Sequence, residues 1–73
     1  MKKIYMMEDL DCANCAAKME EAISKIEGVT SARVSYLAQK LILEADDARF
    51  DEIMAEAVKT CRRIEPGCRI ILE

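Results

Sequence analysis

The chain has 73 residues, with 11 lysines and arginines against 14 aspartates and glutamates, so its net charge is −3, and it contains no histidine. This length fits one domain with a small core, and we expect residues 1–73 to form a single domain. The lack of histidine excludes imidazole metal ligands and histidine-assisted nucleophiles, and the acidic balance with no tryptophan argues against a nucleic-acid surface.

The sequence contains no apolar run near the roughly 18 residues that a membrane span needs. Acidic residues at Glu8, Asp9 and Asp11 interrupt the start of the chain, where a secretory leader would be apolar. We therefore expect a soluble protein in the cytoplasm. Since the cytosol keeps thiols reduced, its four cysteines are expected to serve metal binding or redox chemistry, not disulfides.

The first half of the chain predicts a strand, a helix and a second strand. Residues 3–7 form a short apolar run, which is typical of a buried strand. From Cys15 to Ile26 apolar residues recur at helical spacing, and Gly28 is expected to end this helix in the left-handed conformation. Residues 29–37 alternate between apolar and polar side chains, which indicates a half-buried strand.

The second half repeats this order with the strand first. Residues 38–39 predict a turn, residues 40–45 a returning strand, and residues 46–47 the cap of a second helix. The apolar stripe of that helix consists of Phe50, Ile53, Met54, Ala57, Val58 and Cys61. Residues 65–67, Glu-Pro-Gly, break the chain, and residues 68–72 predict the last strand.

The resulting order is βαββαβ, in two halves of similar length, 4–36 and 40–72. It predicts an α+β, ferredoxin-like sandwich in which two helices cover one face of a four-stranded antiparallel sheet. The alternating directions of these elements place Cys12 and Cys15 at the same end of the sheet as the connection between Cys61 and Cys68.

Cys12 and Cys15 stand three residues apart where the first helix is expected to begin. The unpaired N–H groups of a helix N-terminus lower thiol pKa values and favour thiolates, the form that binds metals. The adjacent Asp11 can add a carboxylate oxygen. Two sulfurs and one oxygen suit a borderline divalent ion such as Zn²⁺ or Cd²⁺, whereas Cu⁺ needs only the two sulfurs.

The other two cysteines allow more than one interpretation. Cys61 falls on the apolar stripe, which predicts a buried, inert thiol, but facing the loop it would complete a site of three sulfurs and one oxygen. Cys68 opens a strand and is a weaker candidate for a metal ligand. A thiol–disulfide oxidoreductase is a further alternative, although the Ala13-Asn14 spacer lacks the proline or glycine common in such enzymes.

Residues 10–20 read Leu-Asp-Cys-Ala-Asn-Cys-Ala-Ala-Lys-Met-Glu, and residues 26–29 read Ile-Glu-Gly-Val. With the βαββαβ order, these stretches resemble a heavy-metal-associated domain, and more narrowly the N-terminal domain of zinc-, cadmium- and lead-transporting P-type ATPases. The resemblance implies that Cys12 and Cys15 are the metal thiolates on a loop that can pass its ion to a partner. It also implies that Asp11 is the third ligand, since the copper branch more usually has Thr at this position.

The resemblance is incomplete at two places. Asp9-Leu10 replaces a frequent Gly-Met, although Leu10 still supplies the apolar anchor that Met would. Copper chaperones of the family carry a Lys near the end of the second helix, close to the thiolates. Here Arg62 is the candidate for that charge-screening role. The other interpretation is that its positive charge simply interacts favourably with the negative end of the helix dipole.

The function implied is binding and delivery of zinc, cadmium or lead by the cytoplasmic N-terminal domain of a cation-exporting P-type ATPase. We expect the chain itself not to be an enzyme, because the pump's Asp-Lys-Thr-Gly-Thr loop and intramembrane Cys-Pro-Cys are absent. A free-standing metallochaperone for zinc or copper is the alternative. The expected partners are the rest of a pump or a metal-donor protein, with the domain a monomer or a metal-bridged dimer.

Overall fold

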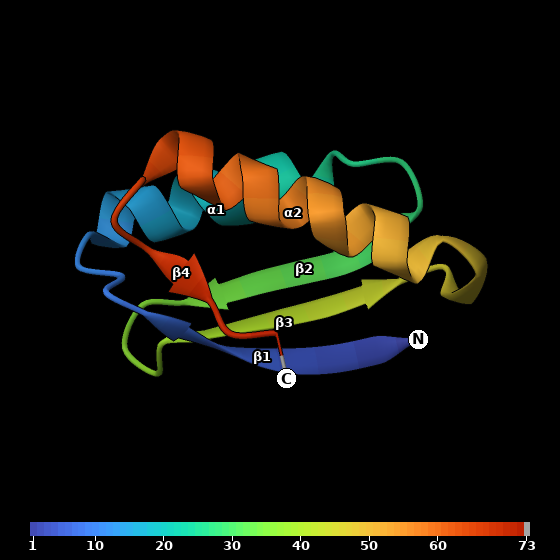
Figure 1. Ribbon diagram of the computed structural model, residues 1–73, viewed down its shortest axis with the longest axis horizontal. Helices are drawn as coiled ribbons and strands as arrows, with labels where there is room; N and C mark the ends of the chain where they lie inside the picture. Colours follow the sequence, from blue (N-terminus) through green and yellow to red (C-terminus); the bar gives the residue numbers. More distant parts are fainter. Residues whose placement is uncertain (73) are drawn as a thin grey trace.

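The computed structural model, which describes residues 1–72, has the predicted βαββαβ order (Figure 1). A short 3₁₀ helix, η1, precedes the second α-helix, and all other elements follow the expected sequence. The elements are β1 (Lys2–Glu8), α1 (Ala13–Ser24), β2 (Val29–Ser35), β3 (Lys40–Ala45), η1 (Asp47–Arg49), α2 (Phe50–Ile64) and β4 (Arg69–Ile70).

The four strands form one sheet in the order β2-β3-β1-β4, and each neighbouring pair is antiparallel. Figure 1 shows both helices on the same face of this sheet. The predicted α+β, ferredoxin-like sandwich is therefore confirmed. Neither helix within residues 1–72 is long and apolar enough to cross a membrane.

The core lies between the helices and the sheet, where the apolar stripe of each helix meets the inward face of the strands. β3 is the central contributor because every second residue points inward, as the period of a strand requires. The most deeply buried side chains include Leu10, Met19, Ile23, Leu41, Leu43 and Ile53. This burial of apolar area is the main stabilising contribution that so small a domain has.

The first helix ends earlier than the sequence predicts. It ends at Ser24, and the N–H of Lys25 donates to the carbonyl groups of the preceding turn. Gly28 does adopt the left-handed conformation, with φ of +96°, but it lies in the turn that leads to β2. A Cβ atom there would lie 2.8 Å from Ile53 Cδ1, so both backbone conformation and packing require glycine.

Two other boundaries differ from the prediction. Asp46 caps η1 and not α2, since its carboxylate accepts a hydrogen bond from the N–H of Ala48 at 3.1 Å. The last strand covers Arg69–Ile70 only, because just two of its residues pair with β1.

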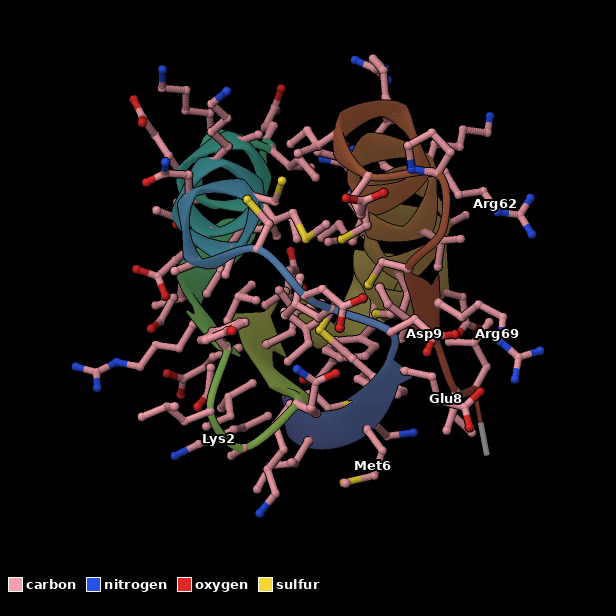
Figure 2. The ribbon with its side chains drawn as sticks, turned by 90° about the vertical axis from the view of Figure 1, so that its left-hand side faces the viewer. Lys2, Met6, Glu8, Asp9, Arg62 and Arg69 are labelled. Carbon is pink, nitrogen blue, oxygen red and sulfur yellow. The ribbon has the colours of Figure 1, made fainter. Side chains whose placement is uncertain are left out.

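The expected placement of the cysteines at one end of the molecule is confirmed. The N-terminus of α1, the turn between β2 and β3, and the connection from α2 to β4 all lie at the left-hand end in Figure 1, away from the chain's N-terminus. Figure 2 looks onto this end.

Candidate metal centre

The two cysteines of the Cys-Ala-Asn-Cys motif lie at the N-terminus of α1. Cys12 is the N-cap residue, with an extended backbone (φ −128°, ψ 116°), and its sulfur accepts a hydrogen bond from the N–H of Cys15 at 3.2 Å. The carbonyl of Cys12 accepts the first intrahelical bond, from Ala16 N–H at 3.0 Å. The sulfur of Cys12 therefore caps the helix by accepting a backbone hydrogen bond, as the side-chain oxygen of Ser or Asp does in other helices. The thiols of Cys12 and Cys15 are both half-buried.

This arrangement separates the acidities of the two thiols. The pKa of Cys12 is lowered, first by the hydrogen bond from the Cys15 thiol and then by the backbone N–H groups of Cys15 and Asn14. The pKa of Cys15 is raised, because its proton is held by Cys12 and because desolvation and the charge of Glu65 disfavour its thiolate. Lys18 acts in the opposite direction on Cys15. The first thiolate to form at this site is that of Cys12.

The loop before Cys12 is held by a side chain from the turn between β2 and β3. The amide of Gln39 accepts a hydrogen bond from Leu10 N–H at 3.0 Å and donates one to Leu10 carbonyl at 2.6 Å. The carbonyl of Gln39 also accepts from the N–H of Met7 at 2.8 Å. Leu10 itself is 1% exposed. The loop is thus fixed by the buried side chain of Leu10 and by hydrogen bonds to both backbone polar groups of that residue.

The structure places a carboxylate beside the thiols that the sequence did not single out. Glu65 Oε2 lies 4.0 Å from Cys15 Sγ, the outer limit for a thiol donor, and Glu65 bears electrostatically on both Cys12 and Cys15. The only sequence signal at this position is the Glu-Pro-Gly turn, which predicts a chain break and no contact.

Asp11, the third ligand expected from the sequence, is exposed on the loop next to Cys12. Its charge reaches Cys68, whose pKa is raised by desolvation first and then by Glu65, Asp9 and Asp11. Within residues 1–72, no three side chains among the cysteines and carboxylates are gathered closely enough to hold an ion as they stand. Ion binding by Asp11 thus requires the loop or its side chain to move.

Cys61 and Cys68 lie beneath this surface, each 2% exposed. Burial raises the pKa of Cys61 to about 12, with a further contribution from Cys68. The apolar stripe predicted a buried Cys61, and its burial fits that interpretation. The accessible thiols of this end are therefore Cys12 and Cys15.

Arg62 was the sequence's candidate for screening the thiolates. It is exposed near the end of α2, and Figure 2 shows its side chain extending outward from the helix. The cation that acts on a site thiol is instead Lys18, one turn into α1.

Comparison with known proteins adds a family and a set of relatives. A family model described as the heavy-metal-associated domain matches residues 4–63. The chain is 30% identical over 66 residues to the cadmium, zinc and cobalt-transporting ATPase of Bacillus subtilis. The aligned region covers 90% of this chain and 9% of that ATPase. It is 30% identical over 64 residues to the copper chaperone CopZ of Enterococcus hirae. This alignment covers 88% of this chain and 86% of the chaperone.

Solved structures share the fold at lower identity. A CopZ metallochaperone superposes with a TM-score of 0.76 at 22% identity, covering 97% of this chain and 100% of that chain. The N-terminal domain of the copper(I) ATPase PacS gives a TM-score of 0.75 at 23% identity, covering 100% of this chain and 94% of that chain. The relatives thus include both pump domains and a separate chaperone, and the ions in their names differ.

Proposed function

The chain belongs to the heavy-metal-associated domain family, and on that premise we propose that it captures a zinc, cadmium or lead ion and delivers it to a cation-exporting P-type ATPase. In this proposal the domain works at the cytoplasmic face of the membrane and is part of the pump itself. It binds and transfers the ion, and ATP hydrolysis belongs to other parts of the pump.

The observation that carries this proposal is the half-buried pair Cys12 and Cys15 at the start of α1, beside carboxylates. The lowered pKa of Cys12 supports a thiolate ready to bind an incoming ion. Two thiolates and one carboxylate carry three negative charges, of which a divalent ion neutralises two and Cu⁺ only one. This balance favours a divalent ion of borderline softness.

We assign Asp11 as an oxygen ligand to the ion held by Cys12 and Cys15. It directly precedes the first thiolate, and its exposed carboxylate is free to turn toward the bound ion. A carboxylate oxygen suits Zn²⁺ and Cd²⁺ and contributes little to Cu⁺.

Transfer to a partner requires a site that can exchange ligands. The motif lies at the partly exposed N-terminus of α1, while the sheet and the buried Leu10 hold the scaffold in place. An incoming thiolate from the partner can then share the ion with Cys12 and Cys15 before it takes over, so that no free ion is released.

A free-standing metallochaperone is the second candidate. It is favoured by the match to the Enterococcus copper chaperone, 86% of which is covered by the alignment. In that case the ion would be zinc or copper, and the partner would be a separate pump.

The test is competitive binding of Zn²⁺, Cd²⁺, Pb²⁺ and Cu⁺ to the reduced protein, with Asp11→Ala and Cys61→Ser beside the wild type. A one-to-one divalent complex that weakens with Asp11→Ala and is unchanged by Cys61→Ser supports the pump domain of the zinc and cadmium type. Tight Cu⁺ binding that is indifferent to Asp11 would instead support copper trafficking. Failure to bind any of these ions tightly would overturn the metal function and revive a thiol–disulfide exchange role.

A further inference from the structure

Within residues 1–72, the helices leave one face of the sheet uncovered. Both α1 and α2 lie on the other face (Figure 1), and Figure 2 shows Lys2 and Met6 extending on the side away from the helices. Because side chains alternate along each strand, the registers of β1, β2 and β3 define three cross-strand rows on the uncovered face. The rows are Lys2, Glu44 and Ser31; Ile4, Ile42 and Arg33; and Met6, Lys40 and Ser35. We call these nine residues the open sheet face.

The centre of the open sheet face is apolar. Ile4 is 60% exposed and Met6 is 48% exposed. Ile42, which lies opposite Ile4 in the register, is half-buried. Single exposed apolar side chains are common on protein surfaces, whereas neighbouring ones that form a cluster mark sites of contact. The middle of the open sheet face is therefore suited to burying apolar area against a partner.

The apolar centre is surrounded by positive charge. The open sheet face holds three cations, Lys2, Arg33 and Lys40, against the one carboxylate of Glu44, so its net charge is +2. Since the whole chain carries −3, the other residues together carry −5. None of the five ion pairs among residues 1–72 includes any of these four charged side chains. The open sheet face is thus a local positive region on an acidic protein, and its cations are available to a partner.

This charge distribution decides which kind of partner fits. A second copy packed face to face would bring two positive regions together, which is unfavourable. An anionic bilayer extends beneath the whole molecule and would also repel its acidic remainder, whereas a protein surface can match the open sheet face locally. Acidic side chains around an apolar centre would pair with the cations and cover Ile4, Met6 and Ile42.

We infer that the open sheet face is a docking surface for a protein partner that presents acidic side chains around an apolar centre. Cys12 and Cys15 lie elsewhere, at the N-terminus of α1 on the other side of the sheet. A partner docked on the open sheet face therefore leaves both thiols uncovered, so docking and ion exchange use separate surfaces. The inference goes beyond the proposed function and does not depend on which ion the thiols bind.

The test is an NMR titration of the reduced, isotope-labelled chain with a synthetic amphipathic helical peptide. The peptide carries leucines along one face with glutamates beside them, and a second peptide with lysines in place of the glutamates is the charge control. The glutamate peptide should shift the amide signals of β1, β2 and β3 more than those of α1 and α2. It should bind at least about tenfold more tightly than the lysine peptide, and added salt should weaken it.

A pair of double variants tests the cations. Arg33→Gln with Lys40→Gln removes two positive charges from the open sheet face and should weaken binding of the glutamate peptide by about fivefold or more. Lys59→Gln with Arg63→Gln removes the same charge from exposed positions on α2 and is the matched control. This control should change the affinity by less than about twofold.

A second pair of variants tests the apolar centre. Ile4→Thr keeps a β-branched side chain in the strand but removes apolar area, and it should weaken the glutamate peptide by about threefold or more. Leu37→Thr changes a side chain that is 92% exposed in the turn between β2 and β3, outside the open sheet face, and should leave the affinity unchanged.

Shifts centred on the helices, equal affinities for the two peptides, or unweakened binding by Arg33→Gln with Lys40→Gln would each overturn the inference. Vesicles of phosphatidylserine and phosphatidylcholine provide the last arm of the test. Binding to these vesicles without binding to the glutamate peptide would assign the open sheet face to a lipid surface and would overturn the protein partner. No metal ion enters these titrations, so their failure is distinct from a failure of the proposed function.

Discussion

Cys12 differs from the other three thiols because its sulfur accepts hydrogen bonds from the start of α1. A thiol reacts with alkylating agents as its thiolate, so acidity and exposure together decide the order of reaction. Cys12 is half-exposed with a lowered pKa, whereas Cys61 and Cys68 are buried with raised pKa values.

Iodoacetamide at neutral pH should therefore modify Cys12 first and leave Cys61 and Cys68 unmodified until the protein unfolds. We expect the rate at Cys12 to exceed that at Cys61 by roughly tenfold or more, measured by peptide mass spectrometry over time. Denaturant provides the control, since all four thiols should then react at similar rates. Early modification of Cys61 in the folded protein would contradict the buried position.

Cys61 also makes stability depend on pH. Its pKa is about 12 in the folded protein against an ordinary value of 9.0, so the folded state keeps the proton that the unfolded chain releases. This contribution is complete below pH 9.0 and is lost as the pH rises toward about 12. The free energy of unfolding should fall by about 1.4 kcal/mol per pH unit for this one group in that window.

Chemical denaturation of the metal-free protein between pH 9 and 11 measures this slope. Cys61→Ala serves as the comparison, because it lacks the titrating thiol and should lose stability less steeply over the same range. Parallel slopes for the two proteins would show that the Cys61 thiol does not hold its proton as its burial implies.

At the scale of elements, the turn between β2 and β3 holds the loop before Cys12 in place through Gln39. Gln39→Leu removes three side-chain hydrogen bonds, one to the carbonyl of Tyr36 and two that serve the N–H and carbonyl of the buried Leu10. Unsatisfied buried polar groups cost about 1–3 kcal/mol each, so the loss for these two Leu10 groups should lower the unfolding free energy by about 2 kcal/mol or more. We expect Cd²⁺ affinity to fall as well.

The control for this change is Gln39→Gly. Gln39 has a positive φ of 55°, which glycine adopts without strain, but glycine lacks the amide that holds Leu10. If the amide matters, Gln39→Gly should still weaken Cd²⁺ binding even where stability is partly regained. Wild-type Cd²⁺ affinity in both variants would show that the loop is held without Gln39.

The elements themselves were largely predictable, because α2 and β3 carry clear helical and strand periods. The end of α1 was not, since Gly28 is required by the turn and by its contact with Ile53 and not by a helix cap. The position of Glu65 beside Cys15 could not be predicted from the sequence, because this contact joins positions 50 residues apart. Its local context, Glu-Pro-Gly, predicts only a turn. Cys12 and Cys15 could be predicted as metal thiolates because the Cys-x-x-Cys spacing is visible within four consecutive residues, and that role stays a prediction.

At the scale of the whole molecule, the candidate site joins the two halves of the chain. Cys12 and Cys15 belong to the first half, and Glu65 lies after α2 in the second. An ion bound by Cys12 and Cys15 in their folded arrangement would favour the folded state of a domain of only 73 residues, whose core alone gives modest stability. Binding and folding should therefore be coupled.

Cd²⁺ at about one hundred times its dissociation constant should stabilise the folded domain by about 2.7 kcal/mol and raise the thermal midpoint by about 10–20 °C. Circular dichroism melts measure this shift. Mg²⁺ in place of Cd²⁺ should give no shift, and neither should Cd²⁺ with the Cys12→Ser, Cys15→Ser double variant.

Unfolding exposes Cys61 and Cys68, which then compete for Cd²⁺ and reduce the shift, because an ion that also binds the unfolded chain stabilises the folded state less. Cys61→Ser should consequently shift at least as far as the wild type. A smaller shift in Cys61→Ser would mean that this buried thiol binds the ion in the folded protein.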